Sequence, residues 1–182
     1  MELNEAYQKA LVWFFSFPNR GITLNDLSRE LKLAKTTTNH VVNRLKKEGF
    51  LKVESLGRVW RISCNKEHHY NYTKKIAYNL MMIYDSGILE RISQLVKNSR
   101  VVILFGSYRK GDDDKNSDID IAVEVLGDKD IKIIELGFVP QIGFRKNVPV
   151  NLHLFTRKSI DLNLFSNIAN GIILDGFLEV NP

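Results

Sequence analysis

The chain has 182 residues, of which 44% are hydrophobic and 26% are charged, and its formal net charge is +5. This composition excludes disordered and fibrous proteins, and the length allows one medium domain or two small ones. The single cysteine, Cys64, excludes an intramolecular disulfide, and no apolar run approaches the roughly 20 residues that cross a bilayer, so we expect a cytoplasmic protein without membrane contact.

The excess of positive charge lies in one part of the sequence. Residues 1–65 contain 11 Lys and Arg and 6 Asp and Glu, which accounts for the whole net charge, whereas residues 66–182 contain 15 of each. A basic segment beside a neutral one indicates attraction to phosphate better than it indicates general solubility. We therefore predict that the first segment binds DNA.

Within the basic segment, the sequence predicts three short helices and a hairpin. Residues 4–17 place apolar side chains at helical spacing. Thr23 can cap a second helix with a buried leucine stripe. A third helix is expected from a turn near Leu33 to Glu48, because Gly49 follows. The two strands of the hairpin are expected at residues 51–55 and 59–63.

This order of elements resembles the winged-helix regulators of bacteria and archaea over roughly residues 5–65. In such domains the third helix enters the major groove and the hairpin forms the wing. With Thr38, Val42 and Leu45 facing inward, the opposite face offers side chains that suit base edges and phosphates. The DNA-binding residues predicted in this way are Thr36, Thr37, Asn39, His40, Asn43, Arg44 and Lys47, with Arg58 at the wing. The alternatives are a solvated helix face and a surface that docks a protein.

Residues 66–87 are expected to link this domain to a second one. The pattern predicts a helix over Asn71–Tyr84, a break, and a further helix over Ile88–Lys97. Their apolar faces comprise Ile76, Leu80, Ile83 and Tyr84 in the first helix and Ile88, Ile92, Leu95 and Val96 in the second. These helices either pack against the second domain or form the surface of a homodimer that reads two half-sites.

The candidate catalytic and ligand-binding residues lie in the stretch VVILFGSYRKGDDDKNSDIDIAV at residues 101–123. Its apolar start, residues 101–105, predicts a buried strand, and residues 117–123 predict another. Alternation along the second strand places Asp118 and Asp120 on one face. Two adjacent carboxylates repel each other unless a cation neutralises them, so the pair predicts a divalent metal site.

The residues around the carboxylate pair suit a nucleoside triphosphate bound with Mg²⁺. That cation is typically held by one or two carboxylates together with phosphate oxygens. Gly106 lets backbone N–H groups approach a phosphate, and the hydroxyl of Ser107 adds a donor. Arg109 and Lys110 can neutralise the remaining phosphate charge. Together these parts favour attack on the α-phosphate with pyrophosphate as the leaving group.

The same stretch resembles the signature of the DNA polymerase β-like nucleotidyltransferase superfamily, in particular its small, stand-alone minimal nucleotidyltransferases. That signature is Gly-Ser, three residues, Gly, several residues and Ser-Asp-x-Asp. It matches at Gly106, Ser107, Gly111, Ser117, Asp118 and Asp120. The resemblance implies two metal ions and nucleotide transfer, with the two aspartates as catalytic metal ligands and the other matched residues, with Lys110, around the nucleotide. It also implies a partner protein, as in toxin–antitoxin systems.

Active members of the superfamily generally use a third carboxylate from a neighbouring strand. The candidate strand is Val148–Thr156, and it has Asn151 at that position. Asparagine can offer a carbonyl oxygen to a cation, but it cannot accept a proton. His153 lies on the same face and is either a substitute base or ligand or a structural residue. Asp112–Asp114, expected to be solvated on a loop, and Glu124, expected to lie far along its strand, are the other substitutes if the fold brings them nearer.

The sequence as a whole predicts an α+β protein in three parts. These are a winged helix-turn-helix over residues 1–65, a linking helix over 66–87, and an α/β nucleotidyltransferase-like domain with a mixed sheet over 88–182, closing with a helix over 159–169 and a strand over 171–176. Three functions are open: an Mg²⁺-dependent nucleotidyltransferase, a nucleotide-sensing transcription regulator whose site turns over weakly or not at all, and a winged helix that docks a protein.

Overall fold

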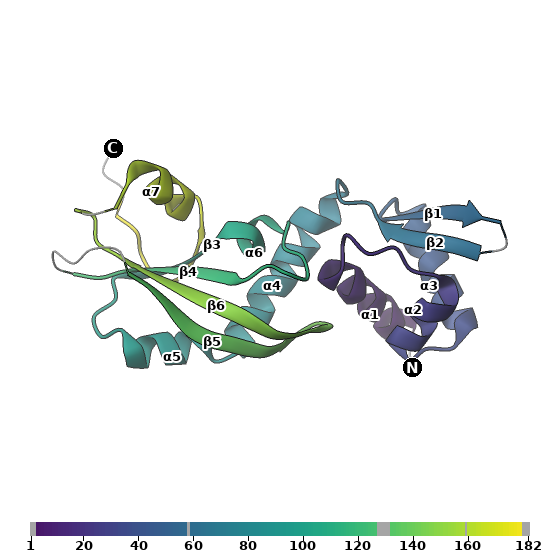
Figure 1. Cartoon of the computed structure of the whole chain (residues 1–182), viewed down its shortest axis with the longest axis horizontal. Helices are drawn as coiled ribbons and strands as arrows, with labels where there is room; N and C mark the ends of the chain where they lie inside the picture. The colour runs from purple at the N-terminus through teal and green to yellow at the C-terminus, as the bar shows by residue number, and fades with distance from the viewer. Residues whose placement is uncertain (1–2, 58, 127–131, 159, 180–182) are drawn as a thin grey trace. The chain divides into compact units, whose positions relative to one another are not determined.

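The computed structural model of the chain consists of two compact units (Figure 1). The described residues are 3–57, 59–126, 132–158 and 160–179. One unit extends to Lys75 and the other begins at Ile76, so the boundary falls within helix α4 (Lys74–Asp85). Among the described helices, none is both long enough and apolar enough to cross a bilayer.

The N-terminal unit folds as three helices followed by an antiparallel hairpin, which is the predicted order (Figure 1). Its elements are α1 (Leu3–Ser16), α2 (Leu24–Leu31), α3 (Lys35–Lys47), β1 (Leu51–Leu56) and β2 (Val59–Cys64). The core is aromatic, because Trp13 and Phe14 of α1 are fully buried and Phe14 meets Phe50 edge to face. The predicted cap of α2 is present: the Thr23 hydroxyl accepts from the backbone N–H of Asp26 at 3.2 Å.

Helix α3 turns its predicted apolar stripe toward this core. Thr38, Val42 and Leu45 are all fully buried. Gly49 adopts a φ of +85°, a conformation that favours glycine, and it ends the helix as predicted. The polar face of α3 is therefore left toward solvent.

The C-terminal unit is built on a five-stranded sheet with the order β5-β6-β4-β3-β7. Strands β4 and β6 run parallel and the other neighbours run antiparallel, which confirms the predicted mixed sheet. The strands are β3 (Val101–Phe105), β4 (Ile119–Glu124), β5 (Lys132–Ile142), β6 (Arg145–Phe155) and β7 (Ile172–Gly176). The remaining helices are α5 (Ile88–Leu95), α6 (Gly106–Lys110) and α7 (Leu162–Ala169).

Hydrophobic layers cover both faces of this sheet. Alternation along β3 sends Leu104 to one face, where it packs with residues of α4 and α5, and Phe105 to the other face, where it packs with α7. Figure 1 shows α5 and α7 on opposite sides of the sheet. Ile119 and Ile121 of β4 belong to the α4/α5 layer, so Asp120 between them points to the α7 side.

The linking segment differs from its prediction. The helix expected over Asn71–Tyr84 begins at Lys74, and a short 3-10 helix, η1 (His69–Tyr72), precedes it. Tyr84, predicted to face inward, is 47% exposed, whereas Asn79 is buried. Ile83 of the predicted face is buried and Leu80 packs against the core, so Tyr84 is the residue that departs from the pattern. Asn79 has buried hydrogen-bond partners that offset the cost of burying its amide.

The sequence did not predict two further elements, and the predicted burial of one apolar residue is wrong. Leu95 of α5, predicted to face the core, is 54% exposed, whereas Val96, predicted on the same face, is buried. Strand β5 was missed because it lies at the edge of the sheet and most of its side chains, including Ile133 and Phe138, are exposed, so its sequence lacks alternation. The residues from Gly106 form a short helix rather than a simple turn.

Candidate functional site

The predicted carboxylate pair lies where β4 meets β6. The parallel register sets Asp120 opposite Asn151 and Ala122 opposite His153. Asp118 comes directly before β4, and both carboxylates are partly exposed. Tertiary pairing thus joins side chains that are 33 residues apart along the chain into one cluster on the α7 face.

Asn151 contacts both carboxylates. Its Nδ2 donates to Asp118 Oδ2 at 3.2 Å and to Asp120 Oδ1 at 3.5 Å. A half-turn of the amide would instead present its oxygen, which is a ligand for a hard cation. The side chain at the position of the third family carboxylate can therefore bridge the two acids or help to bind a cation, but it cannot accept a proton.

His153 flanks the pair from the same strand. Its Nε2 lies 3.4 Å from Asp120 Oδ1, and its ring packs edge to face on Phe105 at a centroid distance of 4.9 Å. Its Nδ1 is buried and has no hydrogen-bond partner among the described residues. The ring therefore offers the site one nitrogen, Nε2, which can donate to the Asp120 carboxylate.

A glycine is required at position 106 for two reasons. Its φ is +71°, and a Cβ at this position would lie 2.7 Å from Asp120 Oδ2. A side chain here would collide with the carboxylate, so the turn that carries Ser107 can approach Asp120 this closely only with glycine. The predicted phosphate-binding turn therefore lies next to the predicted metal ligand.

The other predicted nucleotide-binding residues are distributed around the turn. Ser107 and Lys110 belong to α6, and the Lys110 side chain is exposed. Gly111 ends α6 with a φ of +78°. The hydroxyl of Ser117 accepts from the backbone N–H of Asp114 at 2.9 Å, so it closes the loop between α6 and Asp118.

One expectation about this loop is wrong, and it hides residues that the sequence did not reveal. Asp113, expected to be solvated, is 3% exposed and accepts from Asn79 Nδ2 at 2.9 Å. Arg145, also buried, donates to the hydroxyl of Tyr108 and to the backbone carbonyl of Ser117. A single Asp in an acidic run carries no periodic signal for burial, so only the tertiary partners identify it.

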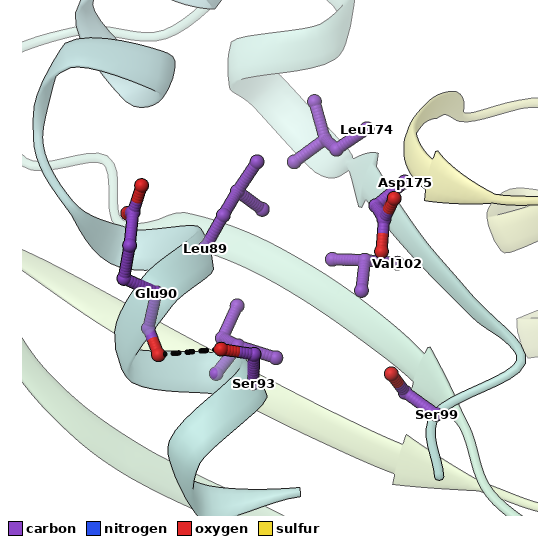
Figure 2. A pocket seen from close by; sticks show the side chains of 8 residues that line it. Leu89, Glu90, Ser93, Ser99, Val102, Leu174 and Asp175 are labelled. Atoms are coloured by element: carbon purple, nitrogen blue, oxygen red, sulfur yellow. Dashed lines mark hydrogen bonds between the residues drawn. The ribbon is translucent and has the colours of Figure 1, made fainter. Parts of the chain in front are cut away.

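A cavity of the C-terminal unit lies away from the carboxylate pair. It has a volume of about 290 Å³ and is bounded by α5, β3 and β7, as Figure 2 shows. Val102 and Leu174, which line it, belong to the layer on the α4/α5 face, whereas Asp120 faces α7. This cavity and the carboxylate pair are therefore on opposite faces of the sheet.

The exposed face of α3 borders a polar groove in the N-terminal unit. Its volume is about 530 Å³, and it is lined by Thr36, Asn39, His40, Asn43, Arg44 and Lys47. These are six of the eight residues predicted to bind DNA. Thr37 is half-buried and does not line the groove, and Arg58 lies outside the described residues.

Arg44 forms a hydrogen-bonded ion pair with the carboxylate of Glu48. Its Nε donates to Glu48 Oε1 at 3.1 Å, and its guanidinium carbon lies 4.3 Å from the centre of the Tyr7 ring. Tyr7 and Tyr70 donate to the other carboxylate oxygen. Burial alone would raise the pKa of Glu48, but the hydrogen bonds from Tyr7 and Arg44 hold it below its ordinary value. The bond to Glu48 uses Nε, and Arg44 also lines the groove on α3.

Comparison with known protein families assigns both units. Residues 19–52 match the model of a winged helix-turn-helix DNA-binding domain, and residues 86–174 match that of a nucleotidyltransferase domain. The chain is a winged helix-turn-helix domain followed by a nucleotidyltransferase domain. A search of curated proteins finds no match.

Nucleotidyltransferase domains generally use divalent metals, and the residues of this domain fit such a cation. Among the described residues, the side chains that bond the Asp118 and Asp120 carboxylates are the amide of Asn151 and the imidazole of His153, and no Lys or Arg pairs with either acid there. Within the described ranges, no three His, Cys, Asp or Glu side chains are arranged to hold a metal by themselves. Such a pair suits a cation whose coordination is completed by phosphate and water.

Proposed function

We propose that this protein is a nucleotide-responsive DNA-binding regulator. Its C-terminal unit binds a nucleoside triphosphate with Mg²⁺, and its N-terminal unit binds duplex DNA. Asp118 and Asp120 hold the cation, Gly106 and Ser107 contact phosphate oxygens, and Lys110, Gly111 and Ser117 complete the nucleotide site. Nucleotide occupancy changes the affinity for DNA.

The contact of Asn151 with both carboxylates favours binding over efficient transfer. Nucleotidyl transfer needs the attacking hydroxyl to lose its proton, and an amide cannot take it. One fewer negative charge also weakens the hold on a second cation. Binding of one Mg²⁺ with a triphosphate requires neither, because phosphate oxygens supply the missing ligands.

The DNA-binding half of the proposal is supported by charge and by shape. The whole net charge of +5 belongs to residues 1–65. The groove on α3 is lined by hydroxyl, amide and basic side chains, which suit base edges and phosphates. Arg44 presents a planar group with several donors, which suits paired acceptors better than a lysine does.

The nucleotide site can be tested with the Asn151→Asp variant. We expect the wild type to bind ATP or another ribonucleoside triphosphate in the presence of Mg²⁺, measured by calorimetry, and to release no pyrophosphate. Asn151→Asp restores a third carboxylate, and we expect it to bind a second cation. Pyrophosphate release by the wild type, with transfer of an α-phosphate label to an acceptor, would overturn the regulator proposal.

DNA binding is tested by a salt titration on duplexes, with and without nucleotide. We expect a steep fall of affinity with salt, and a slope about one unit shallower for each of Arg44→Ala and Lys47→Ala if each residue meets one phosphate. Saturating Mg²⁺ and triphosphate should change the DNA affinity at least about fivefold, the lower bound of ordinary coupling. An unchanged affinity would refute the regulatory link while leaving both binding activities standing.

A second candidate function is nucleotidyl transfer itself. It is favoured by the match of residues 86–174 to a nucleotidyltransferase domain and by the close approach of Gly106 to Asp120. In that reaction a hydroxyl of a protein, nucleic acid or small molecule would attack the α-phosphorus, and pyrophosphate would leave. Label transfer by the wild type that is lost in Asp118→Asn would establish it.

A further inference from the structure

Arg145 is a buried charge that the proposed site does not yet use. It is the first residue of β6, and only 7% of its surface is exposed. One terminal nitrogen donates to the hydroxyl of Tyr108, and the other donates to the backbone carbonyl of Ser117. A guanidinium is removed from water at high cost unless its donors are matched in this way, so its place in the fold is closely determined.

The two partners of Arg145 belong to the two halves of the nucleotide site. Tyr108 follows Ser107 in α6, on the predicted phosphate side. Ser117 precedes Asp118, on the predicted metal side. One guanidinium therefore ties the phosphate-binding turn to the segment that carries the first metal ligand.

The Tyr108 hydroxyl lies among charged groups from both ends of the loop. Burial raises the pKa of its phenol, and the negative charges of Asp113 and Asp118 raise it further, against the opposing effect of Arg145. Tyr108 therefore remains a neutral hydroxyl that can accept from Arg145. The positive charge of Arg145 and the carboxylate of Asp118 are both close enough to influence this hydroxyl.

Asn79 holds the same loop from the other side. Its amide donates to the backbone carbonyl of Tyr108 at 3.2 Å and to Asp113 Oδ1 at 2.9 Å, and all three residues are buried. The loop between α6 and β4 is thus fixed by Asn79 in its first half and by Arg145 at its end. Polar groups fully satisfied in the interior restrict a segment to one conformation.

We propose that Arg145 is a positioning residue that sets the separation between the Gly106–Ser107 turn and Asp118. A cation bound to Asp118 can also bind the phosphate oxygens held at the turn only if the turn and Asp118 are the right distance apart. Because Arg145 sets that distance, it makes nucleotide affinity depend on the metal. Only arginine has the planar group that bonds two acceptors in different directions. This inference rests on the proposed binding of a nucleotide with Mg²⁺.

The test compares Arg145→Lys with Arg157→Lys. Arg157 is the matched control, because it also bonds a buried partner, Glu124, but at the other end of β4. The ligand is α,β-methylene ATP, whose α–β bridge resists cleavage, and its affinity is measured with Mg²⁺ and with EDTA. We expect Arg145→Lys to bind the nucleotide about tenfold more weakly with Mg²⁺ and less than about twofold more weakly in EDTA. About tenfold is the lower end of the loss seen when a residue that supports a metal ligand is replaced. We expect Arg157→Lys to lower the melting temperature and to leave the ratio of the two affinities unchanged.

The outcomes separate this inference from the proposed function. If Arg145→Lys lowers the affinities with Mg²⁺ and in EDTA by the same factor, together with the melting temperature, then Arg145 has only a structural role. The inference is then wrong. Equal affinities of the wild type with and without Mg²⁺ would refute the proposed function and this inference together. If Arg145→Lys does not fold, Tyr108→Phe removes one acceptor and keeps the guanidinium. We expect that variant to lose about threefold with Mg²⁺ only, and an unchanged ratio would overturn the inference.

Discussion

Two carboxylates on the same face of β4 have opposite surroundings. Asp120 and Glu124 are four residues apart, so alternation directs both side chains the same way. The Asp120 side chain is 28% exposed, and its neighbours are the neutral amide of Asn151 and the imidazole of His153. The Glu124 side chain is 3% exposed and accepts from Arg157 Nε at 2.7 Å, with Arg100 at 3.8 Å.

The difference separates a structural acid from a candidate ligand. The charge of Glu124 is neutralised within the fold, and its arginines also pair with Glu179 near the C-terminal end. Asp120 has no arginine or lysine partner among the described residues, and in the proposed function a cation neutralises its charge. Identical chemistry on one strand face thus serves stability at one end and, in the proposed function, ligand binding at the other.

The largest expected effect is on stability, at Glu124. Glu124→Gln keeps the shape but leaves Arg100 and Arg157 without their buried counter-charge, so we expect a loss of about 3 kcal/mol in the free energy of unfolding. Urea denaturation measures it. The control is Glu179→Gln, an exposed partner of the same arginines, for which we expect less than about 0.5 kcal/mol. Equal effects would remove the contrast between buried and exposed acids.

At Asp120 the expected effect appears only with ligand. Mg²⁺ and triphosphate at a hundredfold excess over the dissociation constant should stabilise the wild type by about 2.7 kcal/mol. Asp120→Asn should lose this gain while being no less stable than the wild type without ligand, because one of two repelling charges is removed. Thermal unfolding with and without Mg²⁺ measures both quantities, and a variant that is destabilised in EDTA would contradict a ligand-binding role.

A smaller effect on the free energy of unfolding is expected at Gly106, whose backbone lies close to Asp120. Gly106→Ala introduces a Cβ 2.7 Å from Asp120 Oδ2 at a φ of +71°, so we expect a cost of about 2 kcal/mol and loss of nucleotide affinity. Gly57→Ala is the control. Gly57 shares a positive φ of +62°, but a Cβ there would meet no described atom within 4 Å, so the substitution should cost less and leave nucleotide affinity unchanged. Nucleotide binding that survives Gly106→Ala would show that the close approach has no role.

The smallest effect extends the comparison to Glu48, whose partners are hydroxyls and one exposed arginine. Bonds from Tyr7 and Arg44 outweigh burial and hold its pKa below the ordinary 4.5. A lowered pKa means that the stabilisation is present above the unfolded value and is lost as the pH falls. Glu48→Gln should therefore be less stable than the wild type by about 1 kcal/mol at neutral pH, and the difference should vanish in acid. A difference that persists in acid would exclude the carboxylate as its source.

How much of the site could be predicted depended on whether a residue carried a local signal. Asp118 and Asp120 were predicted because two acids alternate with isoleucines, and Gly106 because the family spacing marks it, and the structure brings these residues together. Asp113 and Arg145 were missed, since each looks like an ordinary surface charge. Their burial follows from partners far along the chain: Asn79 lies 34 residues from Asp113, and Tyr108 lies 37 from Arg145.

The sequence alone determined the order of the two domains, the periodic helices and strands, and the identity of the carboxylate pair, because these depend on spacing between near neighbours. The tertiary structure decided the rest. It exposed Tyr84 and Leu95, added β5 as an edge strand, and paired β4 with β6 so that Asn151 touches both acids. In the part of the chain that the structure describes, Asp120 has no arginine partner while Glu124 has two, and that difference in counter-charge separates a candidate metal ligand from a structural acid.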